Sequence, residues 1–318
     1  MRKALAVGID FYPNLSNLNG CVNDASSIAS ILERNYDGTL NFNIKKLLAT
    51  GKDNYVSRAN LEDAITELFS GTGEVAVLYF SGHGYTENEN GYLITSDSTA
   101  RGRDGVKMED VIEQANKSKI NNKIIILDCC HAGEMGTAKY FNNVSIVGEG
   151  VTILSACTKG QYALETKGHG VFTSLLIDAL HGGAADILGN ISPGGIYAYI
   201  DRALGPWSQR PVFKTNVESF VSLRTAKPSL NQMDLVQIDK IFQTPDEVFP
   251  LDPSFEPESD APDIEHTKVF AILQKMESVN LVVPVDEEHM YHAAINSKGC
   301  KLTSLGLHYW NLVNKKLI

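Results

Sequence analysis

Two short stretches hold the side chains of this sequence that are best suited to chemistry. The first, KIIILDCCHAG over 123–133, is an apolar run that ends in Asp128, two adjacent cysteines and a histidine. The second, VLYFSGHGY over 77–85, is an apolar run that leads to His83 between two glycines. A thiolate attacks a carbonyl carbon far better than a thiol, and a nearby histidine either takes the thiol proton or stabilises the thiolate. The two stretches therefore predict a cysteine nucleophile with a histidine partner.

Both stretches have the pattern of buried strands. Continuous apolar runs such as Ile124–Leu127 are typical of parallel strands covered on both faces. Reactive groups in open α/β sheets collect beyond the carboxyl ends of the strands, so neighbouring strands would bring the histidine and a thiol to one edge. Free cysteines are also among the residues most often buried, so simple packing is the alternative for both cysteines.

The elements around these stretches alternate in type along the chain. Strand patterns at 3–9, 43–49, 74–80, 123–127 and 151–157 alternate with helix patterns at 23–34, 57–69, 106–115, 171–180 and 195–204, before a last strand at 209–215. Such alternation predicts an α/β fold, a mostly parallel sheet with helices on both faces.

Charge and proline content suggest how the 318 residues divide into domains. The formal charge is −10, and between Thr225 and Ile264 nine acidic residues face two lysines. The same segment holds six of the eleven prolines, a composition typical of extended chain. We therefore predict a catalytic domain over 1–224, an acidic proline-rich linker over 225–264 and a small module over 265–318.

The C-terminal module has the pattern of a small, mainly helical domain. Apolar residues at helical spacing over 266–276, a strand-like LVVPV run and two further helix patterns resemble a winged-helix module. From Glu265 onward five acidic residues face six lysines, so the positive charge that phosphate contacts require is missing and we expect no nucleic-acid binding. Tyr291, Tyr309 and Trp310 either offer surface to a regulatory protein partner or pack inside the module.

Composition also bears on location. No stretch approaches the length of a membrane span, and the apolar run after the first three residues is too short for a signal peptide. Five cysteines without CxxC spacing suit reduced thiols better than disulfides. We expect a cytoplasmic protein that does not bind membranes.

The paired motifs resemble those of metacaspases and bacterial caspase-like peptidases (orthocaspases), which are cysteine peptidases of the caspase fold. YFSGHG and DCCHAG carry the resemblance, and NLNGCVNDA, SACTKGQYALE and GHGVFTSLLIDAL support it over about residues 2–221. The resemblance implies that Cys130, directly before the second motif's histidine, is the nucleophile and that His83 is its partner. It also implies an oxyanion hole made by the backbone N–H groups of Gly84 and Cys130, and leaves Cys129 as a packing residue.

The same resemblance implies a pocket for a basic substrate side chain, with Asp24, Ser81 and Asp128 at the matching positions. Carboxylates beside a reactive thiol would repel an acidic substrate residue and attract a cationic one. The alternative for Asp24 is an ordinary helix cap or first-turn acid.

Metal sites are weakly indicated. Some metacaspases use calcium, and Asp97, Glu109 and Asp110 fall near their acidic ligand positions, but a further acidic ligand after the nucleophile has no counterpart. Calcium dependence is therefore open, and no other cofactor is expected. Adjacent cysteines lack the usual spacing of tetrahedral zinc ligands, which disfavours zinc bound by His83, Cys129, Cys130 and His131.

These features predict a regulated cysteine endopeptidase that cleaves protein substrates after arginine or lysine. Lys139 is the only basic residue of the polar stretch 133–150, so we expect any self-cleavage there to follow it. The resemblance implies a role in bacterial stress response, cell death or anti-phage defence. The alternative is a catalytically silent scaffold, or a DNA-binding regulator that acts through the C-terminal module; the presence of both His83 and Cys130 argues against the first and the near-neutral module against the second.

Overall fold

The computed structural model describes most of the chain. The described residues are 1–87, 90–99, 104–129, 147–156, 165–166, 169–205, 210–217 and 219–318. They form two compact units, the N-terminal unit (Met1–Lys227) and the C-terminal unit (Pro228–Ile318).

A six-stranded sheet forms the centre of the N-terminal unit, in the order β12-β8-β7-β3-β1-β2. Its strands are β1 (Arg2–Ile9), β2 (Asn43–Ala49), β3 (Thr72–Ser81), β7 (Lys119–Asp128), β8 (Val151–Ser155) and β12 (Val212–Asn216). All neighbours are parallel except β12, which runs antiparallel to β8 at one edge. The predicted mostly parallel sheet is confirmed.

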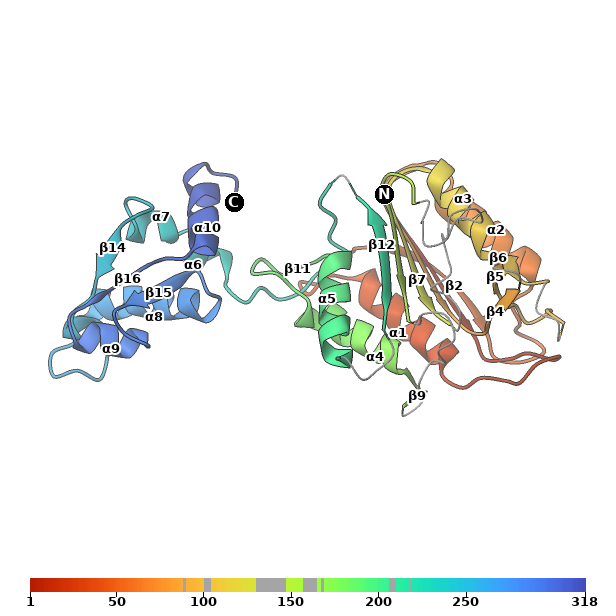
Figure 1. The fold of residues 1–318 in the computed structure, drawn as a ribbon, viewed down its shortest axis with the longest axis horizontal. Coiled ribbons are helices and arrows are strands. Elements are labelled where there is room, and N and C mark those ends of the chain that lie inside the picture. Colours follow the sequence, from red (N-terminus) through yellow and green to blue (C-terminus); the bar gives the residue numbers. More distant parts are fainter. Residues whose placement is uncertain are drawn as a thin grey trace. The chain divides into compact units, whose positions relative to one another are not determined.

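Helices cover both faces of this sheet, as Figure 1 shows. One face carries α1 (Cys21–Glu33), α4 (Val171–Asp178) and α5 (Pro193–Leu204), and the other carries α2 (Arg58–Phe69) and α3 (Met108–Lys117). A π-helical segment, Ala179–Gly183, continues α4. Successive side chains of a strand point to opposite faces. Ala4 and Ala6 of β1 therefore belong to the core beneath α1, whereas Leu5 and Val7 belong to the core beneath α2.

Short strands complete the N-terminal unit. They are β4 (Gly84–Glu87), β5 (Asn90–Leu93) and β6 (Val106–Lys107) in one antiparallel sheet, β9 (Glu165–Thr166) paired with β10 (His169–Gly170), and β11 (Asn190–Ile191) paired with β13 (Arg224–Thr225). Because β4 begins directly after His83, strand pairing fixes the chain on the far side of that residue. The backbone N–H of Ile94 also donates to the carbonyl oxygen of His83, at 3.0 Å.

The C-terminal unit has its own core and its own sheet. It contains α6 (Gln232–Leu235), α7 (Ile238–Ile241), β14 (Val248–Pro250), a 3-10 turn (Pro253–Phe255), α8 (Ile264–Ser278), β15 (Val282–Val285), α9 (Met290–Ile295), β16 (Gly299–Leu302) and α10 (Ser304–Asn314). The strands form an antiparallel sheet in the order β14-β16-β15. Phe242, Phe270 and Met276 are fully buried and form part of this core.

The structure corrects the extended linker expected over 225–264. This segment contains α6, α7 and β14, and the unit boundary lies at Lys227. Its Phe242 is buried and accepts a 2.8 Å hydrogen bond from Trp310 Nε1 through the carbonyl oxygen. The acidic composition predicted extended chain wrongly, because two of the acids cap helical segments. Asp263 accepts backbone N–H groups at the start of α8, and Asp252 accepts the N–H of Ser254. Acids in capping positions stabilise local structure rather than extend the chain.

In the parts of the chain that the structure describes, no helix has both the length and the apolar character required to cross a membrane.

Candidate active site

The ends of three neighbouring strands define the candidate site. Ser81, the last residue of β3, is paired with Gly8 in β1 and with Asp128 in β7. His83 follows β3 by two residues, and Cys129 follows β7 directly. The two motif-bearing strands are therefore neighbours, which meets the condition for bringing both motifs to one edge of the sheet, and their carboxyl ends are level.

His83 is held by contacts from the loop after β1. Its backbone N–H donates to the Tyr12 hydroxyl at 2.9 Å, and the two rings lie with their centroids 4.7 Å apart. Its Nε2 lies 2.8 Å from the carbonyl oxygen of Ser16. Because a carbonyl oxygen only accepts, we assign the proton of the neutral imidazole to Nε2, which leaves Nδ1 as the basic nitrogen. Tyr12 and Ser16 are contacts of His83 that the sequence motifs did not reveal.

Tyr12 also explains the glycine before His83. A Cβ atom added at Gly82 would lie 2.7 Å from the Tyr12 hydroxyl oxygen, too close for any side chain. Tyr12 is buried, and burial raises the pKa of its phenol well above the usual value. The tyrosine therefore stays neutral and serves as a fixed acceptor for the His83 N–H.

The proposed nucleophile lies in a part of the chain that the structure does not describe. Cys130, His131 and the self-cleavage candidate Lys139 lie outside the described residues. Cys129 is buried, with 1% of its surface exposed, and belongs to the core beneath α2. Its burial is the environment expected of a packing residue. Gly84 stands at the start of β4, and its N–H as an oxyanion donor stays a prediction.

The structure brings Asp24, Ser81 and Asp128 to one place. All three are buried, with 2%, 2% and 6% of their surface exposed. Gly170 lies against both aspartates, since its N–H donates to Asp24 Oδ2 at 3.3 Å and a Cβ atom added to it would lie 2.4 Å from Asp128 Oδ2, while Ser81 is level with Asp128 in the sheet. Burial chiefly raises the pKa of the Cys21 thiol, a hydrogen bond with Ser81 opposes that rise, and negative charge on Asp10, Asp128 and Asp24 adds to it. Cys21 is therefore a neutral thiol beside the acidic pair and is no rival for the nucleophile.

Close packing of α1 on β1 places Asp24. A Cβ atom added at Gly8 would lie 2.3 Å from the carbonyl oxygen of Cys21, so only glycine lets the start of α1 approach the strand. Asp24 stands in the first turn of α1, but the residue at the capping position is Gly20, which makes no side-chain cap. Asp24 Oδ2 instead accepts the backbone N–H of Gly170 at 3.3 Å. Its side chain therefore reaches across to the segment before α4.

Asp128 also accepts from α4. The Thr173 hydroxyl donates to Asp128 Oδ2 at 2.6 Å and lies 2.6 Å from the Tyr79 hydroxyl. Buried carboxylates need such partners, because an uncompensated buried charge is strongly destabilising. Sequence analysis missed Gly170 and Thr173 as donors, although both stand in the GHGVFTSLLIDAL stretch that supports the family resemblance.

The calcium candidates have protein partners. Asp97 accepts from the Thr95 hydroxyl at 2.7 Å and from the backbone N–H of Arg58 at 2.9 Å. Glu109 forms an ion pair with Lys107, and Asp110 contributes to the electrostatic environment of Arg58. Within the described ranges, no group of three or more histidine, cysteine or acidic side chains gathers around a position for a metal ion. Calcium dependence therefore stays open, as it was from the sequence.

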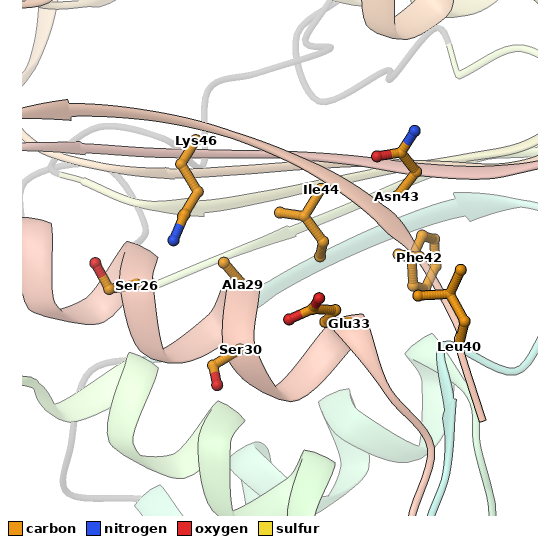
Figure 2. Close-up of a pocket in the computed structure, with 9 residues that line it drawn as sticks. All are labelled: Ser26, Ala29, Ser30, Glu33, Leu40, Phe42, Asn43, Ile44 and Lys46. Carbon is orange, nitrogen blue, oxygen red and sulfur yellow. The ribbon is translucent and has the colours of Figure 1, made fainter. Parts of the chain in front are cut away.

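A pocket of about 420 Å³ lies between α1 and the edge strand β2, away from these residues. Figure 2 shows Ala29 and Glu33 of α1 on the side of the helix that faces Ile44 and Lys46 of β2. Its strand residues pair with the first half of β1, between Lys3 and Ala6, whereas Asp128 is the last residue of β7 and His83 follows the end of β3 by two residues. The pocket is therefore not part of the candidate active site.

Comparison with known proteins identifies the family. The sequence model of a family described as Caspase domain matches residues 1–210. The chain belongs to the caspase domain family. A caspase domain supports a cysteine-peptidase-like function, and the matched range contains both the histidine and the cysteine motif.

A solved structure shares the fold over much of this chain. The crystal structure of protein GSU0716 from Geobacter sulfurreducens is similar with a TM-score of 0.51 and 19% sequence identity, over 71% of this chain and 97% of that chain. At this identity the likeness concerns the fold alone. No curated protein matches the sequence closely enough to count as a relative.

Proposed function

We propose that this caspase domain is a cysteine endopeptidase that cleaves after arginine or lysine, with Cys130 as nucleophile and His83 as its base. One observation carries the substrate preference: two buried carboxylates, Asp24 and Asp128, gather with Ser81 at the strand ends that lead to His83. Negative charge held inside the protein is favourable for binding only if a cation comes to meet it.

The proposed reaction is an acyl transfer through the cysteine. Nδ1 of His83 takes the thiol proton, and the thiolate attacks the carbonyl carbon of the peptide bond. The backbone N–H groups of Gly84 and Cys130 bind the oxyanion that forms. Collapse breaks the C–N bond, and the imidazolium gives its proton to the leaving amine. Water activated by His83 then hydrolyses the thioester and restores the thiol.

In the proposed cycle the carbonyl oxygen of Ser16 orients the His83 ring and stabilises its charged form. The imidazole becomes positively charged when it takes the thiol proton, and the hydrogen bond from Nε2 to that carbonyl, 2.8 Å in length, then becomes a charge-assisted one. The contact orients the ring before the reaction and stabilises it afterwards. Tyr12 fixes the backbone from which the ring extends.

A panel of fluorogenic peptides tests the substrate preference. We expect arginine and lysine peptides to be hydrolysed and the matching aspartate peptide to be hydrolysed at least about 100-fold more slowly, since a charge-assisted hydrogen bond contributes about 1.5–3 kcal/mol and an acid would be repelled. The measurement is kcat/KM for peptides that differ only in the residue before the cleaved bond. Fastest turnover of the aspartate peptide would contradict the proposal.

We further propose that the C-terminal unit regulates the peptidase through protein contacts. Of the three aromatic residues considered for contacts, Tyr309 is buried and Trp310 is bonded inside the unit, whereas Tyr291 is 47% exposed. Tyr291 is therefore the aromatic residue available for a partner. We also propose that the C-terminal unit is a winged-helix-like module.

Truncation tests the regulatory role. A chain that ends at Lys227 keeps the whole N-terminal core, so we expect it to fold. Its active-site cysteine should still react with an alkylating inhibitor. Its activation or its choice of protein substrates should differ from that of the full-length chain. Full-length protein with Tyr291→Ser is the matched surface variant and should share part of the change. Identical cleavage of the same proteins by the truncated and full-length chains, or tight binding of duplex DNA by the full-length chain at physiological salt, would refute it.

A further inference from the structure

The first turn of α4 lies against both acidic side chains of the proposed substrate pocket. Gly170, the residue that caps α4, donates its N–H to Asp24 Oδ2 at 3.3 Å. A Cβ atom added at Gly170 would lie only 2.4 Å from Asp128 Oδ2. The glycine backbone is thus in contact with both carboxylates and leaves no room there for a side chain. The start of a helix favours negative charge, so this placement stabilises both acids.

Thr173, three residues into the same turn, makes the shortest of these contacts. Its side chain is fully buried, and its hydroxyl donates to Asp128 Oδ2 at 2.6 Å. A hydroxyl has one proton to donate, so the 2.6 Å contact between Thr173 and Tyr79 must use the tyrosine proton. Burial raises the pKa of Tyr79 well above its usual value, so the phenol keeps that proton. Tyr79 donates to Thr173, and Thr173 donates to Asp128.

This chain of hydrogen bonds limits the freedom of the carboxylate. A side-chain carboxylate with an anchored oxygen loses rotation, and hydrogen bonds that run in series through one hydroxyl strengthen one another in a buried site. A cation that binds an already oriented carboxylate loses less free energy to ordering than one that must first fix it. The effect belongs to substrate binding, because neither Thr173 nor Tyr79 is part of the cysteine and histidine chemistry.

We propose that Thr173, supported by Tyr79, is a positioning residue that orients Asp128 for the basic side chain of the substrate. The inference rests on the proposed function and adds to it residues of α4 and β3 outside the group of Asp24, Ser81 and Asp128. Gly170 sets how closely the start of α4 approaches the two carboxylates.

Thr173→Val tests this inference, because valine keeps the branched shape and removes the hydroxyl. We expect KM for an arginine peptide to rise about tenfold or more, as for the loss of one charge-assisted hydrogen bond, with kcat changed less than about threefold. Thr173→Ser keeps the hydroxyl and should restore KM to near the original value. Iodoacetamide labelling of the active-site cysteine should proceed at the same rate in all variants.

A matched control is available in the same sheet. Thr152 is also a fully buried threonine, and its hydroxyl is paired with that of Thr215 near the amino-terminal end of β8. Thr152→Val makes the same chemical change away from the strand ends that form the site. It should leave KM unchanged even if it lowers the melting temperature.

The outcomes separate the inference from the function on which it rests. If the unaltered protein hydrolyses arginine peptides but Thr173→Val leaves KM unchanged, or Thr173→Ser is as impaired as Thr173→Val, the positioning role is refuted. If the unaltered protein hydrolyses no basic peptide, the proposed function fails and the inference fails with it. If Thr173→Val does not fold, Tyr79→Phe tests the proposal instead, since it removes the hydroxyl that donates to Thr173. This variant should raise KM for the arginine peptide about threefold with kcat retained. An unchanged KM would overturn the proposal.

Discussion

Replacement of Cys130 by alanine is expected to lower kcat for an arginine peptide by at least about 10⁴-fold, whereas Cys129→Ala keeps most of the activity. Removal of a nucleophile leaves only the rate supported by binding and the oxyanion donors. Cys129 is packed in the core beneath α2 with 1% of its surface exposed, so its thiol is not accessible to a substrate. Its loss should lower the melting temperature, because the smaller side chain leaves a cavity.

Covalent labelling locates the nucleophile independently of rate. A peptide inhibitor that ends in arginine and carries an alkylating group should modify Cys130 in the unaltered protein and in Cys129→Ala. Mass spectrometry of the digested protein identifies the modified residue. A label on Cys129 alone, or equal loss of activity in the two alanine variants, would show that the assignment is wrong.

Asp128→Asn is expected to reduce kcat/KM for arginine and lysine peptides by about 100-fold or more. Asparagine has nearly the same shape, and its amide oxygen can still accept the Thr173 hydroxyl, so the change chiefly removes charge. The loss should appear mainly in KM, because the carboxylate binds the substrate side chain and takes no part in bond breaking. With the negative charge reduced, the difference between arginine and uncharged peptides should narrow.

Two comparisons define the Asp128 result. Asp24→Asn should raise KM for arginine and lysine peptides as well, since Asp24 and Asp128 both lie against Gly170 in the proposed substrate pocket. Asp37→Asn alters an exposed acid in the turn after α1, where the carboxylate accepts hydrogen bonds from Thr39. This variant should leave kcat/KM for arginine and lysine peptides unchanged. An Asp128→Asn protein that is folded and still cleaves arginine peptides at the original rate would remove the acidic pocket from the mechanism.

The sequence by itself determined the central architecture. Runs such as Ile124–Leu127 are long, apolar and rich in β-branched residues, and a run of this kind between helix patterns has few stable positions other than the middle of a parallel sheet. Once β3 and β7 are neighbours, Ser81 and Asp128 must be level, because the register of parallel strands leaves little freedom. The candidate site at the strand ends follows from local patterns for this reason.

Only the tertiary structure decided which groups support the site. Thr173 meets Tyr79 across 94 residues of sequence, and Tyr12 meets His83 across 71. A hydroxyl has no sequence pattern that names its acceptor, since the partner depends on how helices pack on the sheet. The acidic segment after Lys227 is a second example: Asp252 and Asp263 are helix caps, while Leu235, Ile238 and Phe242 are buried in the core. Composition counts charges without their positions, and burial depends on contacts between segments that no local pattern contains.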